Sequence, residues 1–192
     1  GIPIHTSWFL EDNRMRILKW DDLIECSEIV KEDIGVTIGV FDGIHIGHQQ
    51  LMKSINDTDL IPTIITFTKN PATVLKTRNF QGNILSLEQK LTKLKLFGIR
   101  LVILIDFSHD FSKISGKEFW SSLFRCLYVR KIALGHNFRF GYNRESNSDT
   151  LKSFAPPGII VDVIDPVFYR GKAVSSTRIR TLIHKGEFTD AQ

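Results

Sequence analysis

The hydrophobic residues of the chain gather in short, nearly continuous runs rather than in strict alternation with polar residues. Runs of this kind are typical of parallel strands that are buried on both faces of a sheet. Five runs predict such strands: Val36–Phe41, Thr63–Phe67, Leu101–Ile105, Ile132–Leu134 and Ile159–Ile164.

Between these runs, apolar residues recur at helical spacing. Leu87, Leu91 and Leu94 predict a helix from Ser86 to Phe97 that is capped by Gly98. Further helices are predicted over Gly47–Asn56, Ser115–Leu127 and Ser175–His184. Alternating strands and helices predict an α/β domain with a Rossmann-like, doubly wound sheet of about five parallel strands and helices on both faces. Ligands of such sheets bind beyond the carboxyl ends of the strands, near the reversal in strand order.

Two polar stretches, Thr68–Asn83 and Gly141–Ser148, are expected to be long loops, which in compact domains often bind ligands. Met15 begins a plausible bacterial start, so we expect residues 1–14 to be vector-derived or an upstream extension. Residues 15–192 are expected to form a single domain. Three phenylalanines are expected to pack in the core rather than to line a ligand site: Phe107, Phe111 and Phe119.

The composition excludes little but narrows the setting. Hydrophobic residues make up 42% of the 192 positions and charged residues 24%, as in ordinary globular proteins. The net charge of +4 suits the binding of anionic small molecules. The sequence contains no Arg/Lys-rich run with interleaved aromatic residues, the pattern that would favour nucleic-acid binding. No apolar run reaches the roughly 20 residues that cross a bilayer. Cys26 and Cys126 form no metal-binding or disulfide pattern, which favours the cytoplasm.

A glycine-rich stretch, residues 39–48 (Gly-Val-Phe-Asp-Gly-Ile-His-Ile-Gly-His), leads from the first of these strands into a helix. Backbone N–H groups and a helix N-terminus can bind phosphate in this geometry, and glycine lets the backbone approach it closely. His45 and His48 lie about one helical turn apart, where imidazoles can donate hydrogen bonds to phosphate oxygens. Asp42 either contacts the ligand or holds the turn through backbone amides.

A second anion site is predicted at residues 174–180 (Val-Ser-Ser-Thr-Arg-Ile-Arg). Ser175 or Ser176 is a good N-cap, and the free N–H groups of the helix would face an anion. Thr177 and Arg180 share a helix face, and Arg180 can span two oxygens of a polyphosphate. Taken alone, the pattern also fits a capped surface helix.

A third motif occupies residues 134–141 (Leu-Gly-His-Asn-Phe-Arg-Phe-Gly), where a strand ends in glycine. Asn137 can orient a substrate or merely cap a turn. Arg139, between two phenylalanines, can contact a ligand or be a solvated residue at a strand end.

The first motif resembles the signature of the nucleotidylyltransferase superfamily, and its Phe-Asp-Gly-x-His form looks like bacterial FAD synthetase. Bacterial FAD synthetase is the FMN adenylyltransferase domain of the bifunctional riboflavin kinase/FAD synthetase family. The second motif is similar to that family's Ser-Ser-Thr-x-x-Arg, and the third to its Gly-x-(Asp/Asn)-Phe-x-Phe-Gly. Residues 66–71 resemble its Phe-x-Pro-x-Pro flavin-side loop, with Lys69 in place of the first proline. The resemblance extends from about Met15 to Gln192.

The resemblance implies that AMP is transferred from ATP to FMN, giving FAD and pyrophosphate. It implies catalytic roles for His45, His48, Asn137 and Arg180. It implies ATP contacts by Gly39, Phe41, Asp42, Gly43, Gly47, Ser175, Ser176 and Thr177. It implies flavin contacts by Phe67, Pro71, Arg139 and Phe140. Mg²⁺ is expected to accompany ATP, with no protein ligand assigned to it.

The expected partners are the small molecules ATP and FMN, without nucleic acid, a membrane or an obligate protein partner. No riboflavin kinase domain is expected in this chain. Three alternatives remain open from the sequence. The first is an adenylyl- or cytidylyltransferase for another small phosphorylated acceptor, and the second is a non-catalytic flavin- or nucleotide-binding relic. The third is an RNA-binding protein that uses its basic surface.

Overall fold

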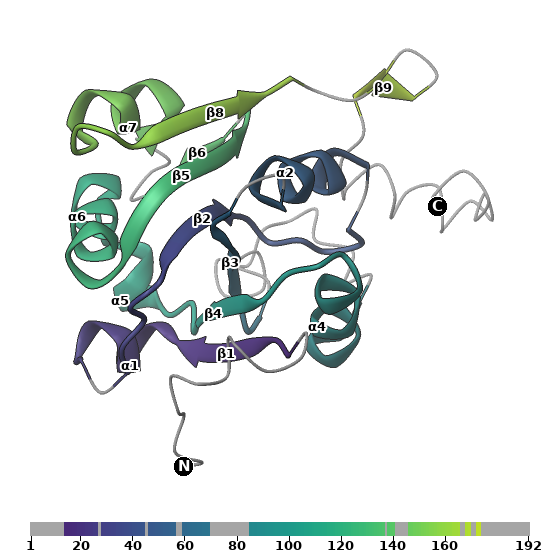
Figure 1. Cartoon of the computed structure of the whole chain (residues 1–192), viewed down its shortest axis with the longest axis horizontal. Coiled ribbons are helices and arrows are strands. Elements are labelled where there is room, and N and C mark those ends of the chain that lie inside the picture. Colours follow the sequence, from purple (N-terminus) through teal and green to yellow (C-terminus); the bar gives the residue numbers. More distant parts are fainter. Residues whose placement is uncertain are drawn as a thin grey trace.

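The computed structural model of the chain is built around one central parallel sheet (Figure 1). It describes residues 14–26, 28–44, 46–56, 59–69, 85–136, 138–140, 146–165, 168–169 and 172–173. The sheet has six strands in the order β1-β4-β3-β2-β5-β8, and every neighbouring pair is parallel. The Rossmann-like α/β class predicted from the apolar runs is confirmed.

Each of the five predicted runs falls on a strand of this sheet. The six strands are β1 (Arg16–Lys19), β2 (Asp33–Ile38), β3 (Ile61–Phe67), β4 (Leu101–Ile105), β5 (Tyr128–Gly135) and β8 (Ile160–Ile164). The predicted end of the strand Val36–Phe41 is wrong, because the matching strand β2 ends at Ile38 and residues 39–41 already belong to the loop. The additional strand, β1, is a short edge strand in which buried and exposed residues alternate.

Helices cover both faces of the sheet, as predicted. They are α1 (Trp20–Ile24), α2 (Ile46–Asn56), α4 (Leu87–Leu96), α5 (His109–Ser112), α6 (Gly116–Cys126) and α7 (Ser148–Phe154). Figure 1 shows α2 and α4 on one side of the sheet, and α1, α5, α6 and α7 on the other. Two short hairpin-like pairs complete the described elements: β6 (Arg139–Phe140) with β7 (Ser146–Asn147), and β9 (Phe168–Tyr169) with β10 (Lys172–Ala173).

The ends of the predicted helices follow their capping residues. Ser86 forms a capping box with Gln89 at the start of α4, and Gly98 follows that helix with a φ of 88°, which favours glycine. Ser115 caps α6 through the backbone N–H of Glu118. The predicted loop over 141–148 is wrong at its end, because Asn147 caps α7, which begins at Ser148. The helix predicted over 175–184 and most of the loop predicted over 68–83 lie outside the described residues.

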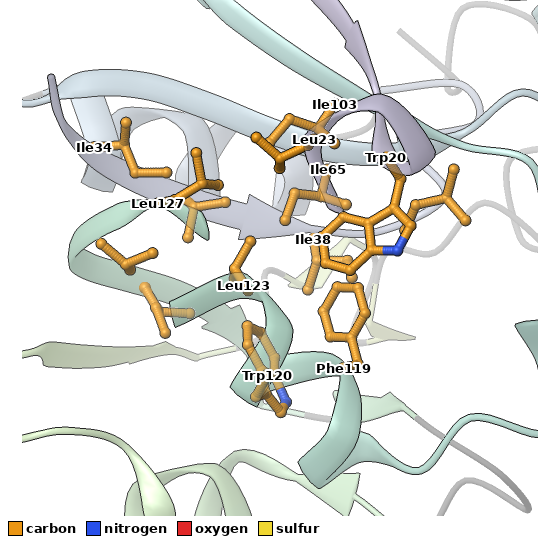
Figure 2. Packing of buried hydrophobic residues seen from close by; sticks show 14 of the residues in the cluster. Trp20, Leu23, Ile34, Ile38, Ile65, Ile103, Phe119, Trp120, Leu123 and Leu127 are labelled. Atoms are coloured by element: carbon orange, nitrogen blue, oxygen red, sulfur yellow. The ribbon is translucent and has the colours of Figure 1, made fainter. Parts of the chain in front are cut away.

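Each face of the sheet has its own core. On one face, β-strand residues pack with α1, α6 and α7, and Trp20 stacks on Phe119 with ring centroids 4.8 Å apart (Figure 2). Phe119 is buried in this cluster, as predicted, and Phe107 and Phe111 are partly buried against it. On the other face, the core is formed mainly by α2 and α4 against β3 and β4, with Phe41 at one end.

The strand order places a topological switch beside β2. From β2 the chain builds β3 and β4 on one side, and then returns to build β5 and β8 on the other. The loops that leave the carboxyl ends of β2 and β5 therefore flank the switch point, where ligands of doubly wound sheets bind. The first motif, residues 39–48, begins directly after β2, and the third motif, residues 134–141, begins at the end of β5.

Candidate functional site

The loop after β2 turns sharply before α2 begins at Ile46. Phe41, Gly43 and Ile44 have φ values of 54°, 83° and 37°, so three of four consecutive residues are left-handed. For residues other than glycine such a conformation costs on the order of 1–3 kcal/mol each, and it persists only where the surroundings enforce it. Burial enforces it here, because Phe41 is fully buried and Ile44 is 5% exposed.

His48 lies in the first turn of α2, against the ring of Phe41. The centroids of the two rings are 4.8 Å apart and their planes are inclined at 54°. Gly39 also lies close to this ring, because a Cβ added there would meet Cε2 of Phe41 at 3.1 Å. The loop thus fixes the imidazole through a buried aromatic ring at the switch point of the sheet.

Asp42 is buried and connects this loop to the start of α4. Its Oδ1 accepts a hydrogen bond of 3.1 Å from the backbone N–H of Leu85, 43 residues further along the chain. The sequence leaves two roles open for Asp42, contact with the ligand or stabilisation of its own turn. The bond to Leu85 adds a structural role that neither of them includes, and its contact with ATP stays a prediction.

Lys90 of α4 is a charged residue at this edge that sequence reasoning missed. It is 8% exposed, and burial lowers its pKa from 10.5 to about 8, although the charge of Asp42 acts in the opposite direction. The sequence does contain a signal for it. Lys90 falls at helical spacing between Leu87 and Leu94, on the apolar stripe of the helix, where a lysine must be buried.

The structure brings part of the predicted site together at the carboxyl ends of β2 and β3. Seven predicted residues are described there with their side chains or backbone: Gly39, Phe41, Asp42, Gly43, Gly47, His48 and Phe67. Arg139 and Phe140 form β6, which pairs with β7. The other predicted residues lie outside the described part of the chain: His45, Pro71, Asn137, Ser175, Ser176, Thr177 and Arg180.

The ring of Phe67 is part of the core. It is 5% exposed and meets the ring of Phe107 edge to face, with centroids 5.6 Å apart. The residue that follows, Thr68, is half-buried, and its backbone N–H donates to the carbonyl of Ile105 at 3.0 Å. A flavin contact by Phe67 therefore stays a prediction, and its described partners are core residues.

No group of three or more His, Cys, Asp or Glu side chains is arranged to hold a metal ion within the ranges that the structure describes. Over the same ranges, no helix is both long enough and apolar enough to pass through a membrane. Cys26 and Cys126 are both free thiols.

A six-stranded parallel sheet with a glycine-rich, histidine-bearing loop at its switch point defines a Rossmann-like fold of the nucleotidylyltransferase type. Solved structures share it. A macrolide-efflux protein from Streptococcus pneumoniae superposes with a TM-score of 0.79 and 27% identity, over 92% of this chain and 59% of the other. Pantoate-beta-alanine ligase from Francisella tularensis shares the fold with a TM-score of 0.56 and 14% identity, over 88% and 79% of the chains.

The chain belongs to the FAD synthetase family, whose family model matches residues 27–178. A FAD synthetase from Listeria monocytogenes is 31% identical over 162 residues, 82% of this chain and 66% of the relative. A putative bifunctional riboflavin kinase/FMN adenylyltransferase from Geobacillus thermodenitrificans is 31% identical over 157 residues, 80% and 84% of the two chains. The chain spans about half the length of other curated relatives, such as 51% of a second, bifunctional Listeria protein.

Proposed function

We propose that this chain is an FMN adenylyltransferase, which transfers AMP from ATP to FMN and releases FAD and pyrophosphate. Membership of the FAD synthetase family supports the substrate pair. The observation that carries the proposal for this chain is the loop after β2, in which buried Phe41 holds His48 at the switch point of the sheet.

The reaction is a single in-line displacement at phosphorus. A terminal phosphate oxygen of FMN attacks the α-phosphorus of ATP, and a new P–O bond forms as the bond from the α-phosphorus to the bridging oxygen of pyrophosphate breaks. No covalent enzyme intermediate is required. The protein accelerates such a step by positioning the two substrates and by stabilising the charge on the phosphate oxygens.

His48 would donate a hydrogen bond to a phosphate oxygen of ATP as negative charge builds on it. A donor fixed in advance by its neighbours needs no reorganisation when the reaction occurs, which is why its position against Phe41 matters. The left-handed backbone at Gly43 and Ile44 turns the chain tightly ahead of α2 and directs the loop toward the helix N-terminus, where phosphate is favoured.

The remaining assignments rest on the resemblance in sequence. His45 would act with His48, Asn137 would orient a substrate phosphate or ribose, and Thr177 with Arg180 would hold the departing pyrophosphate. ATP contacts are also assigned to Gly39, Phe41, Asp42, Gly43, Gly47, Ser175 and Ser176, and flavin contacts to Phe67, Pro71, Arg139 and Phe140.

Mg²⁺ would enter with ATP, held by phosphate oxygens and water, and it would neutralise phosphate charge. The free thiols of Cys26 and Cys126 fit a location in the reducing cytoplasm.

The test is incubation of the purified chain with FMN, ATP and Mg²⁺, followed by chromatographic separation of FAD from FMN. We expect FAD and pyrophosphate to appear in equal amounts. Binding of both substrates without pyrophosphate would identify a non-catalytic relic. Pyrophosphate formed only with a different phosphorylated acceptor would identify another nucleotidyltransferase.

A further inference from the structure

The side chain of Lys90 joins the ends of two neighbouring strands. Its Nζ donates to the carbonyl of Val40 at 3.0 Å, to Oγ1 of Thr66 at 3.1 Å and to the carbonyl of Phe67 at 3.1 Å. Val40 lies in the loop after β2, whereas Thr66 and Phe67 are the last two residues of β3. One amine of α4 is therefore bonded to both segments at the edge of the candidate site.

A hydroxyl closes the group of bonds. Oγ1 of Thr66 donates to the carbonyl of Val40 at 3.0 Å, so the carbonyl of Val40 accepts from both Thr66 and Lys90. We call Val40, Thr66, Phe67 and Lys90 the Lys90 bridge. Thr66 is fully buried and Lys90 is 8% exposed, so water is poorly placed to replace these bonds.

The charge of Lys90 makes the bridge complete. An ammonium group has three N–H donors, and here it meets three acceptors, whereas a neutral amine could donate to only two of them. Burial of a charged group costs free energy, and a methionine would fill much of the same space without that cost. Packing alone therefore gives no reason for a lysine at this point of the apolar stripe.

The two bridged segments lead to different halves of the proposed reaction. From Val40 the chain continues through Phe41 to His48, which is proposed to contact ATP. From Phe67 it continues through Thr68 toward the segment proposed to contact FMN. The bridge therefore lies at the point from which both segments leave the sheet.

We propose that Lys90 is a positioning residue, which holds the loop after β2, proposed to contact ATP, and the carboxyl end of β3 at the spacing that in-line attack requires. This inference rests on the proposed function. Lys90 itself contacts neither substrate in this proposal. Displacements of about 1 Å in such an arrangement can lower the rate by about a hundredfold, even when each substrate still binds.

The experiment compares Lys90→Met with two other variants. Thr66→Val removes the hydroxyl of the bridge while keeping the shape of the side chain. Lys93→Met, at an exposed position of the same helix, is the matched control for loss of a lysine charge. For each variant, kcat for FAD formation is measured, together with the separate Kd values for ATP and for FMN by calorimetry.

We expect kcat to fall about 10- to 100-fold in Lys90→Met and by a smaller factor in Thr66→Val, with each Kd within about threefold of the unsubstituted chain. Lys93→Met should match the unsubstituted chain. A merely structural role would instead lower the calorimetric stoichiometry and kcat together, and that result would overturn the proposal. If Lys90→Met does not fold, Thr66→Val decides, and an unchanged kcat in it would overturn the proposal.

Failure of the proposed function gives a different result. If the unsubstituted chain makes no FAD, the adenylyltransferase assignment is overturned, and the positioning role with it. If the unsubstituted chain makes FAD and folded Lys90→Met has the same kcat, the positioning role alone is overturned.

Discussion

The ring of Phe41 lies against the imidazole of His48, with centroids 4.8 Å apart and planes inclined at 54°. Phe41 is fully buried and its φ of 54° places it in the left-handed region, so both packing and backbone fix its ring. The orientation of His48 on α2 therefore depends on a residue seven positions earlier in the loop.

Removal of the imidazole should lower the rate while leaving the fold intact. We expect His48→Ala to reduce turnover by about 10²–10³, the scale of one lost transition-state donor. Gln50→Ala, at an exposed position of the same helix, should leave turnover unchanged. Steady-state FAD formation and circular dichroism together test this, and normal turnover in a folded His48→Ala protein would contradict the assignment.

Substitution of Phe41, whose ring supports His48, should lower turnover by more than the loss of folding stability explains. In Phe41→Leu we expect a loss of stability below the ~3–5 kcal/mol typical of Phe→Ala in a core. We also expect kcat to fall about tenfold, because His48 loses the ring that orients it. Phe119→Leu, in the core on the other face of the sheet, is the matched control and should lose stability but keep kcat. Equal kcat values in the two variants would show that Phe41 acts only through packing.

A methyl group at Gly39 should strain the same contact. Its Cβ would lie 3.1 Å from Cε2 and 3.4 Å from Cζ of Phe41, and the buried ring has little room to yield. We expect Gly39→Ala to lower the free energy of unfolding by about 1–3 kcal/mol, as overpacked sites do. Urea unfolding measures this, with Gly135→Ala as the control, since nothing lies within 4 Å of a Cβ there. Equal stability of the two variants would argue against a close contact at Gly39.

The lowered pKa of Lys90 predicts a pH dependence of stability. The value falls from 10.5 to about 8 on folding, so between these pH values the unfolded chain binds more protons than the folded chain. The free energy of unfolding must therefore rise with pH across this window, through this group, by on the order of 3 kcal/mol. Other lysines and tyrosines titrate here too, so the quantity to measure is the difference between the unsubstituted chain and Lys90→Met. Parallel curves from pH 8 to 10.5 would contradict a buried amine.

The sequence predicts those parts of the fold in which the local pattern of apolar and polar residues alone determines the secondary structure. β3 and β4 are buried on both faces, so their apolar runs are continuous and easy to recognise. β1 is a four-residue edge strand, and its polar Arg16 is nevertheless 4% exposed, because the guanidinium donates to the carbonyl of Ile29 at 3.1 Å. A strand this short carries too few residues to establish a period of two.

The candidate site divides in the same way. The glycine-rich loop and His48 are contiguous in sequence, so their spacing alone predicts the position of the site. The bonds from Asp42 to Leu85 and from Lys90 to Val40 join residues 43 and 50 positions apart. Periodicity reports the face of a helix on which a residue lies, but not its distant partner. Lys90 could have been recognised as buried from its stripe, whereas its role required the structure.

The position of β1 at the edge of the sheet has a consequence for the order of folding. β1 pairs with β4, so Arg16 lies beside Leu101. More than eighty residues separate these two residues in the sequence. Closing so long a connection costs more entropy than closing the short ones among β2, β3 and β4. We therefore expect β1 to dock late, after β4 has joined the sheet, and with it the stacking of Trp20 on Phe119. Trp20, which completes one hydrophobic core, thus comes earlier in the chain than almost all of the residues on which it packs.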